Sequence, residues 1–210
     1  MIHGNSMDEG GHMTIQLKND KISASFKTMG AELTSLKDSN AVEYLWQGNG
    51  DYWSGQAPVL FPIIGCLRGG TASVSGDKTC SFGRHGLARK KEFTLVSSTE
   101  TKAVFSLKAD DETKEQYPFD FELVITYTLE HQELTVNYQV ENTGKEEMYF
   151  GIGGHPAFNV PLESSLTFED YYLSFSPKKS RTQIPLAGPF IDLANKTLAQ
   201  TNTSLDLTHQ

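Results

Sequence analysis

Apolar and polar residues alternate with a period of two along much of the chain. Within residues 21–38, Ala24 and Phe26 share one face of an expected strand, and apolar positions resume at Leu33 after an expected turn at Met29 and Gly30. A period of two places successive side chains on opposite faces of a strand. The pattern therefore predicts two antiparallel strands, each with one buried face.

Residues 121–130 and 133–142 show the same alternation over longer stretches. The short link at His131 and Gln132 predicts a hairpin between them. Only residues 110–119 favour a helix, a short one with an acidic N-cap and an end before Pro118. Three further stretches are rich in β-branched and aromatic residues and are expected to be strands: 91–98, 102–109 and 170–176.

Many strands of similar length, with one short helix, predict an all-β fold: a large antiparallel β-sandwich or a barrel. Residues 1–12 carry no apolar pattern and are interpreted as a tag remnant, so residues 13–210 are expected to form a single domain. The alternation is still running at Gln210, so we expect the sandwich to be incomplete at its C-terminal side. Unpaired strand edges there would favour self-association.

Charge and cysteine content narrow the possible functions. The 210 residues carry a formal net charge of −8, from 26 acidic and 18 basic residues, which disfavours a nucleic-acid partner. No stretch reaches the roughly 20 apolar residues that cross a bilayer, and no signal peptide is seen, so we expect a cytoplasmic protein without a membrane partner. Cys66 and Cys80 form no CxxC pair, and a cytoplasmic location favours free thiols.

Two histidines lie in glycine-rich loops rather than on strand faces. His85 lies in "GRHGLAR" and His155 in "GIGGHPAFNVP". The flanking glycines at 83, 86, 153 and 154 would let a ligand approach the backbone closely. Each histidine can still be a simple hydrogen-bonded loop residue. The sequence shows no close HxH or HxxxH pair, so we expect no metal site. Pro156 occupies the third glycine position of a GxGxxG motif, which excludes a dinucleotide loop.

Two apolar features also allow a functional interpretation. The segment "PVLFPIIG" at 58–65 is best explained as a buried edge or crossing segment. Trp46 and Trp53, with Tyr44 and Tyr52, could stack on sugar rings, although core packing is the favoured interpretation for each.

Six segments together resemble the aldose 1-epimerase, or galactose mutarotase-like, family and its LacX-type branch. They are "GAELTSL" (30–36), "EYLWQG" (43–48), "YWSGQAPVLFPIIG" (52–65), "HGLAR" (85–89), "YPFDFEL" (117–123) and "GGHPAFNVPL" (153–162). The resemblance extends in order from Met13 to the end of the chain. It implies a galactose mutarotase-like supersandwich that interconverts the α and β anomers of a hexose, with no cofactor.

The resemblance also implies roles for individual residues. His155 matches the family's general acid at the ring oxygen, and His85 matches the histidine that binds and orients the sugar. Candidate substrate-binding residues are Arg68, Arg89, Phe158 and Asn159. Two features depart from the family. Cys66 stands where many members have an arginine, with Arg68 two residues later as a possible substitute. In addition, no residue matches the family's base glutamate, so we expect weak sugar binding and slow catalysis.

Two other functions stay open from the sequence. A hexose-6-phosphate 1-epimerase would use Arg89, with Arg84 or Lys90, to meet a phosphate; the alternative for this basic run is a solvated surface. A non-catalytic carbohydrate-binding protein would keep the sandwich and both loops without the base.

Overall fold

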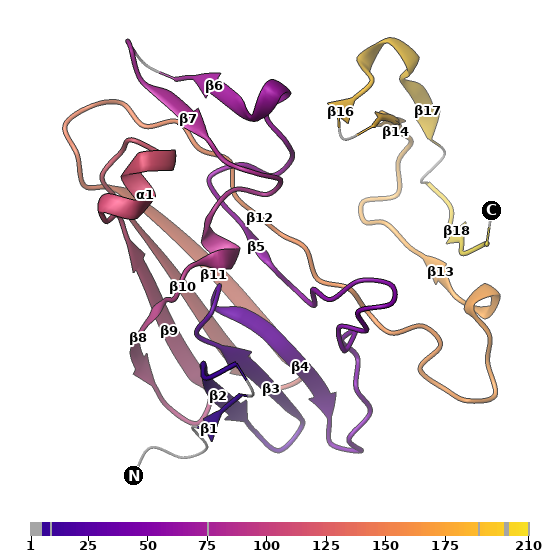
Figure 1. Ribbon diagram of the computed structural model, residues 1–210. Coiled ribbons are helices and arrows are strands. Elements are labelled where there is room, and N and C mark those ends of the chain that lie inside the picture. The colour runs from indigo at the N-terminus through magenta and orange to yellow at the C-terminus, as the bar shows by residue number, and fades with distance from the viewer. Residues whose placement is uncertain (1–5, 9, 75, 189, 200–201, 210) are drawn as a thin grey trace. The chain divides into compact units, whose positions relative to one another are not determined.

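The computed structural model describes residues 6–8, 10–74, 76–188, 190–199 and 202–209. The chain divides into two compact units, Met1–Phe158 and Asn159–Gln210 (Figure 1). Strands dominate the first unit, and the predicted all-β class is confirmed. None of the helices within the described ranges is long and apolar enough to cross a membrane.

The first sheet is an antiparallel meander in which each strand pairs with the next along the chain. Ala24 and Phe26 are fully buried, and the predicted turn lies at Gly30, whose φ of 70° is readily adopted only by glycine. The sheet includes residues from the segment interpreted as a tag. Its strands are β1 (Ser6–Met7), β2 (Met13–Lys18), β3 (Ile22–Lys27) and β4 (Glu32–Asp38).

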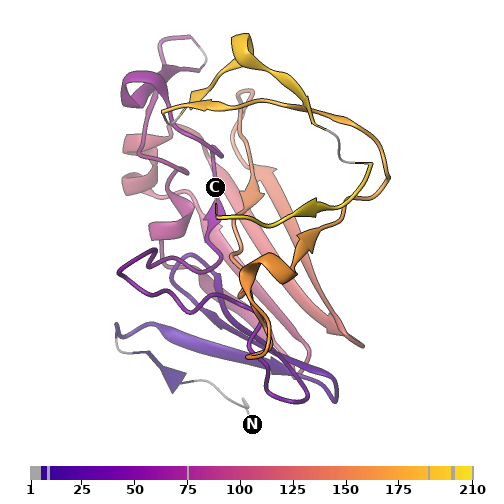
Figure 2. The same cartoon turned by 90° about the vertical axis from the view of Figure 1, so that its right-hand side faces the viewer.

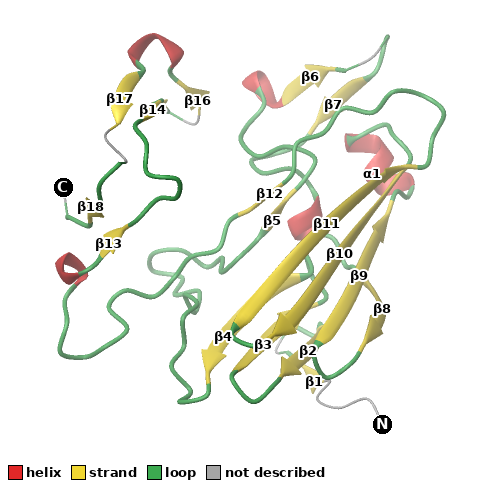
Figure 3. Ribbon diagram, turned by 180° about the vertical axis from the view of Figure 1, so that it is seen from behind, coloured by secondary structure: helices red, strands yellow, loops and turns green. Residues whose placement is uncertain are grey.

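The second sheet has the order β11-β10-β9-β8 (Figure 3). The long pair β10 and β11 is in register from Phe121 opposite Asn142 to Glu130 opposite Glu133, which confirms the predicted hairpin. The predicted helix is α1 (Asp111–Gln116), and the Asp110 side chain accepts a hydrogen bond from the Thr113 N–H as its N-cap. The strands are β8 (Thr94–Ser98), β9 (Lys102–Lys108), β10 (Phe121–Glu130) and β11 (Glu133–Asn142).

The two sheets lie next to each other (Figure 2). Buried aromatic side chains from both sheets belong to one core. The ring centroid of Phe26 lies 4.2 Å from that of Tyr127 and 6.2 Å from that of Phe105. The Tyr127 hydroxyl donates to the Ala31 carbonyl at 2.8 Å. Burial raises the pKa of Tyr127, so this hydroxyl stays a proton donor across the neutral range. The buried faces of both sheets therefore form one sandwich core, as predicted.

The first unit also contains short strands and 3-10 helices outside its two large sheets. β5 (Val59–Leu60) pairs with β12 (Gly153–Gly154), and these two-residue strands lie beside the second sheet in Figure 1. The other short elements are η1 (Arg68–Gly70), β6 (Thr71–Ser73), β7 (Thr79–Ser81) and η2 (Ala88–Lys90).

The second unit contains only short strand pairs. Its predicted strand at 170–176 is reduced to the two residues of β13, which pair with β18 and are exposed. None of its described residues is buried, so little apolar packing is available to extend a strand. Its elements are η3 (Phe168–Asp170), β13 (Tyr172–Leu173), β14 (Arg181–Gln183), β15 (Leu186–Ala187), β16 (Phe190–Ile191), η4 (Leu193–Asn195), β17 (Thr197–Ala199) and β18 (Leu205–Asp206).

Candidate active site

The apolar segment 58–65 holds the His155 loop through its backbone. Gly154 pairs with Val59 in the β5–β12 ladder. One residue further on, the His155 N–H donates to the Pro58 carbonyl at 3.1 Å. Because Pro58 is buried, this contact ties the His155 backbone to the core while the residue itself stays exposed.

The same segment holds the His85 loop. The His85 N–H donates to the Gly65 carbonyl at 2.8 Å, and the Leu87 N–H donates to the Phe61 carbonyl at 2.9 Å. The His85 side chain is also fixed, because its Nδ1 hydrogen bonds to the Ile64 carbonyl. A carbonyl can only accept, so Nδ1 carries the proton in the neutral imidazole, and Nε2 is left to accept a hydrogen bond from a ligand.

The structure brings the two histidines together although they are far apart in sequence. Their ring centroids lie 5.5 Å apart, with an angle of 54° between the planes. His85 is partly buried and His155 is exposed. The pair therefore presents two imidazoles at a distance at which one small molecule can contact both.

Gly86 has a different role from the one the sequence suggested. The expectation that it leaves room for a ligand is wrong, because a Cβ on Gly86 would overlap the Phe61 carbonyl and lie 2.8 Å from the Pro62 nitrogen. Gly86 and Phe61 form a parallel bridge, and the φ of Gly86 is 75°. Gly86 thus allows the His85 loop to approach segment 58–65. At Gly83, by contrast, nothing lies within 4 Å of the position that a Cβ would take.

Trp53 also belongs to the site, although core packing was the favoured interpretation of its sequence context. Its ring centroid lies 5.1 Å from that of His155, at an angle of 50°. The Trp46 indole N–H donates to the Trp53 carbonyl at 2.7 Å, which fixes the backbone that carries this ring. Trp53 is partly buried, and its neighbour Tyr52 is 82% exposed. The Trp53 ring therefore lies beside the exposed His155 imidazole, an arrangement that suits a sugar ring.

The other predicted substrate-binding residues lie on separate elements. Arg68 is exposed in η1, and Arg89 is partly buried in η2. Within the part of the chain that the structure describes, the Arg89 Nε is buried without a hydrogen-bond partner. Phe158 is 60% exposed and forms a bridge with Leu45, whereas Asn159 begins the second unit. The substrate-binding roles of these four residues stay predictions.

Other titratable groups have evident structural roles. Both cysteines are free, as expected, and burial raises the pKa of the Cys80 thiol. Asp170 accepts hydrogen bonds from Thr167, and these lower the pKa of its carboxyl. Across the described residues, no three His, Cys, Asp or Glu side chains gather in a metal-binding arrangement.

A sequence model of aldose 1-epimerase matches residues 13–207, which include both histidine loops. The chain belongs to the aldose 1-epimerase family. It is 43% identical over 204 residues to the plasmid-encoded protein LacX of Lactococcus lactis subsp. lactis, a match that covers 93% of this chain and 68% of LacX. This similarity places it in the LacX branch of the family.

Two further proteins are similar to this aldose 1-epimerase family chain. A galactose mutarotase related enzyme from Lactobacillus acidophilus matches with a TM-score of 0.90 and 37% identity, over 93% of this chain and 65% of that protein. The chain thus spans just under two thirds of that structure. A putative glucose-6-phosphate 1-epimerase of Escherichia coli K12 is 28% identical over 152 residues, which cover 66% of this chain and 48% of that protein.

Proposed function

We propose that this chain is an aldose 1-epimerase-like isomerase that binds a hexose at the His85–His155 pair and interconverts its α and β anomers. The observation that carries the proposal is the 5.5 Å separation of the two imidazoles in a chain of this family. Family membership supports a sugar epimerase role, and the exposed His155 beside Trp53 supports a site open to a small ligand.

The proposed reaction needs one acid and one base. A base removes the proton of the C1 hydroxyl, the bond between C1 and the ring oxygen breaks, and the ring oxygen takes its electron pair together with a proton from the acid. The resulting aldehyde rotates about the C1–C2 bond and the ring closes by the reverse steps. An imidazole titrates near neutral pH, so it can give the proton on opening and recover it on closure.

We assign His155 as the acid because its imidazole is exposed and lies beside the Trp53 ring. His85 then orients the sugar, since its Nδ1 is held by the Ile64 carbonyl and its Nε2 can accept from a sugar hydroxyl. No carboxylate is assigned as the base. Arg68, Arg89, Phe158 and Asn159 remain candidate contacts to the sugar, and the proposed reaction needs no cofactor.

A phosphorylated hexose is the second candidate substrate. One relative carries the name putative glucose-6-phosphate 1-epimerase. In this chain Arg84 is exposed and directly precedes His85. A guanidinium at that position could form charge-assisted hydrogen bonds with a phosphate while the ring contacts the imidazoles. The third candidate is a carbohydrate-binding protein without catalysis, because the sandwich and both loops serve binding alone equally well.

We expect this chain to bind free hexose and to accelerate anomer interconversion above the buffer rate. The test combines tryptophan fluorescence titration with polarimetry on freshly dissolved α-glucose, α-galactose and α-glucose 6-phosphate. Stronger binding and faster conversion of the phosphate ester would identify the phosphorylated substrate class. Binding without any acceleration would support the non-catalytic alternative, and no binding of any of the three would contradict a sugar site at the histidine pair.

A further inference from the structure

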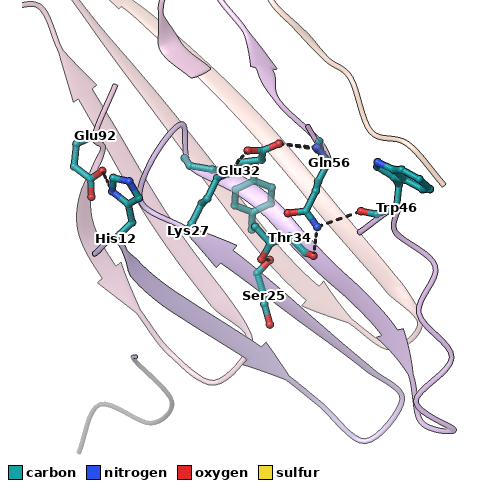
Figure 4. A network of polar contacts seen from close by, with 11 residues as sticks. His12, Ser25, Lys27, Glu32, Thr34, Trp46, Gln56 and Glu92 are labelled. Atoms are coloured by element: carbon teal, nitrogen blue, oxygen red, sulfur yellow. Dashed lines mark hydrogen bonds and ion pairs between the residues drawn. The ribbon is translucent and has the colours of Figure 1, made fainter. Parts of the chain in front are cut away.

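Glu32 is a buried carboxylate at the start of β4, and its contacts extend away from its own sheet. The residue is only 6% exposed. Its Oε1 accepts hydrogen bonds from the backbone N–H groups of Gln56 and Ala57, each at 3.0 Å, and its Oε2 lies 2.7 Å from the Lys27 Nζ (Figure 4). Both oxygens therefore have partners, as a buried carboxylate requires.

The residues that Glu32 holds are the ones that support the His155 loop. The Gln56 carbonyl accepts from the Ala157 N–H at 2.9 Å, and the Pro58 carbonyl accepts from the His155 N–H at 3.1 Å. These two acceptors flank Ala57, and the two donors flank Pro156. The Glu32 side chain thus fixes the backbone of residues 56–58, to which the His155 loop is hydrogen bonded.

The Gln56 side chain extends the same network to Trp53. Its Nε2 donates to the Thr34 carbonyl at 2.8 Å and to the Trp46 carbonyl at 3.1 Å (Figure 4). The Trp46 N–H in turn donates to the Ala157 carbonyl at 2.9 Å, and the Trp46 indole donates to the Trp53 carbonyl. The network therefore holds both members of the Trp53–His155 ring contact.

We propose that Glu32 is a positioning residue that sets the place of the His155 imidazole through the backbone of residues 56–58. This inference rests on the proposed function only in giving His155 a role in sugar chemistry. The hydrogen bonds that join Glu32 to residues 56–58 and to the His155 loop do not depend on that function. A strand that only had to pair with β3 would not need a carboxylate at this position, whereas two adjacent backbone N–H groups facing one point require an acceptor.

The contact between Trp53 and His155 supplies a readout that does not depend on activity. A protonated imidazole quenches the fluorescence of an indole that it touches. In the parent chain we expect tryptophan emission to be lower at acidic pH than at alkaline pH, because a protonated imidazole beside Trp53 quenches the indole. The part of this fall that disappears in His155→Ala belongs to the ring contact. In Glu32→Gln we expect that part to be lost by at least half, because the neutral amide loses the ion pair with Lys27 and the charge-assisted hydrogen bonds from the Gln56 and Ala57 N–H groups.

Glu122→Gln is the matched control for the change in charge. The Glu122 carboxylate is partly buried, accepts from the Ser106 hydroxyl at 2.7 Å and lies 3.7 Å from the Lys108 Nζ, on the second sheet. Its replacement should leave the quenching unchanged. Circular dichroism establishes that each variant is folded. Glu32→Asp keeps the charge but withdraws the acceptor by one methylene, and it serves the same test if the amide variant does not fold.

Two outcomes decide the proposal. Reduced quenching in folded Glu32 variants, with unchanged quenching in Glu122→Gln, supports it. Full quenching in a folded Glu32 variant overturns it. In the sugar assay the Glu32 variants should lower kcat by about 10²-fold with KM little changed, as expected for a misplaced reacting group. A chain that shows the fluorescence result but no sugar conversion would contradict the proposed function and leave the positioning role intact.

Discussion

His155→Ala is expected to lower kcat for anomer interconversion by about 10²–10⁴-fold, the usual contribution of one positioned acid or base. The imidazole is exposed, with its ring against Trp53 and its backbone bonded to Pro58, so its removal takes away the acid and leaves the surrounding frame in place. Polarimetry on α-glucose and α-galactose, with the parent and the variant at equal concentration, measures the effect.

His131→Ala is the control for loss of a histidine in general. His131 is exposed in the turn between β10 and β11. Its backbone carbonyl accepts a hydrogen bond from the Asn19 side chain, and this contact does not involve the imidazole. Its replacement should leave kcat unchanged. A His155→Ala variant that converts sugar at the parent rate would remove His155 from the mechanism.

Gly86→Ala is expected to destabilise the protein by about 2–5 kcal/mol. The left-handed backbone conformation costs a residue with a Cβ about 1–2 kcal/mol, and forcing atoms into a packed site costs a further 1–3 or so. Both costs apply here, because the φ of Gly86 is 75° and the new methyl group would overlap the Phe61 carbonyl. Urea unfolding monitored by circular dichroism measures the change, and sugar binding should weaken as the His85 loop moves.

Gly70→Ala separates the two costs. Gly70 has a φ of 78°, and nothing lies within 4 Å of the position that a Cβ would take. We therefore expect only the conformational cost, about 1–2 kcal/mol. Equal losses in both variants would contradict the close approach of Gly86 to the Phe61 carbonyl.

The sandwich could be predicted in detail where the strands are long and one face is buried. β10 and β11 have the bounds that alternation predicted, because ten residues of strict alternation leave one register that buries the apolar face. The short helix was also predictable, since its N-cap and the proline after it are local signals. In the second unit the strands have two or three residues each, too few for alternation to mark them.

The histidine pair was predictable from loop composition and family resemblance, but its support was not. The composition of segment 58–65 predicts a buried edge or crossing segment, whereas its part in the site consists of backbone hydrogen bonds to residues distant in the chain. Main-chain contacts of this kind leave no residue-type signal. Glu32 likewise looks like one polar residue in a strand, and only the fold shows that Gln56 and Ala57 converge on it.

The second unit leaves one prediction open. Its exposed apolar side chains, among them Leu186, Leu193 and Leu198, form the kind of surface that favours association. Self-association of the chain stays a prediction.

An NMR experiment on the parent chain, with galactose or glucose at anomeric equilibrium, tests the proposed sugar site at the histidine pair most directly. Magnetisation transfer between the α and β anomeric protons gives the exchange rate, and the imidazole resonances are followed in the same sample. We predict exchange above the buffer rate, with sugar-dependent shifts at His85 and His155 and none at His131. Exchange at the buffer rate with no shift at either His85 or His155 would contradict the assignment of a sugar epimerase site to this pair.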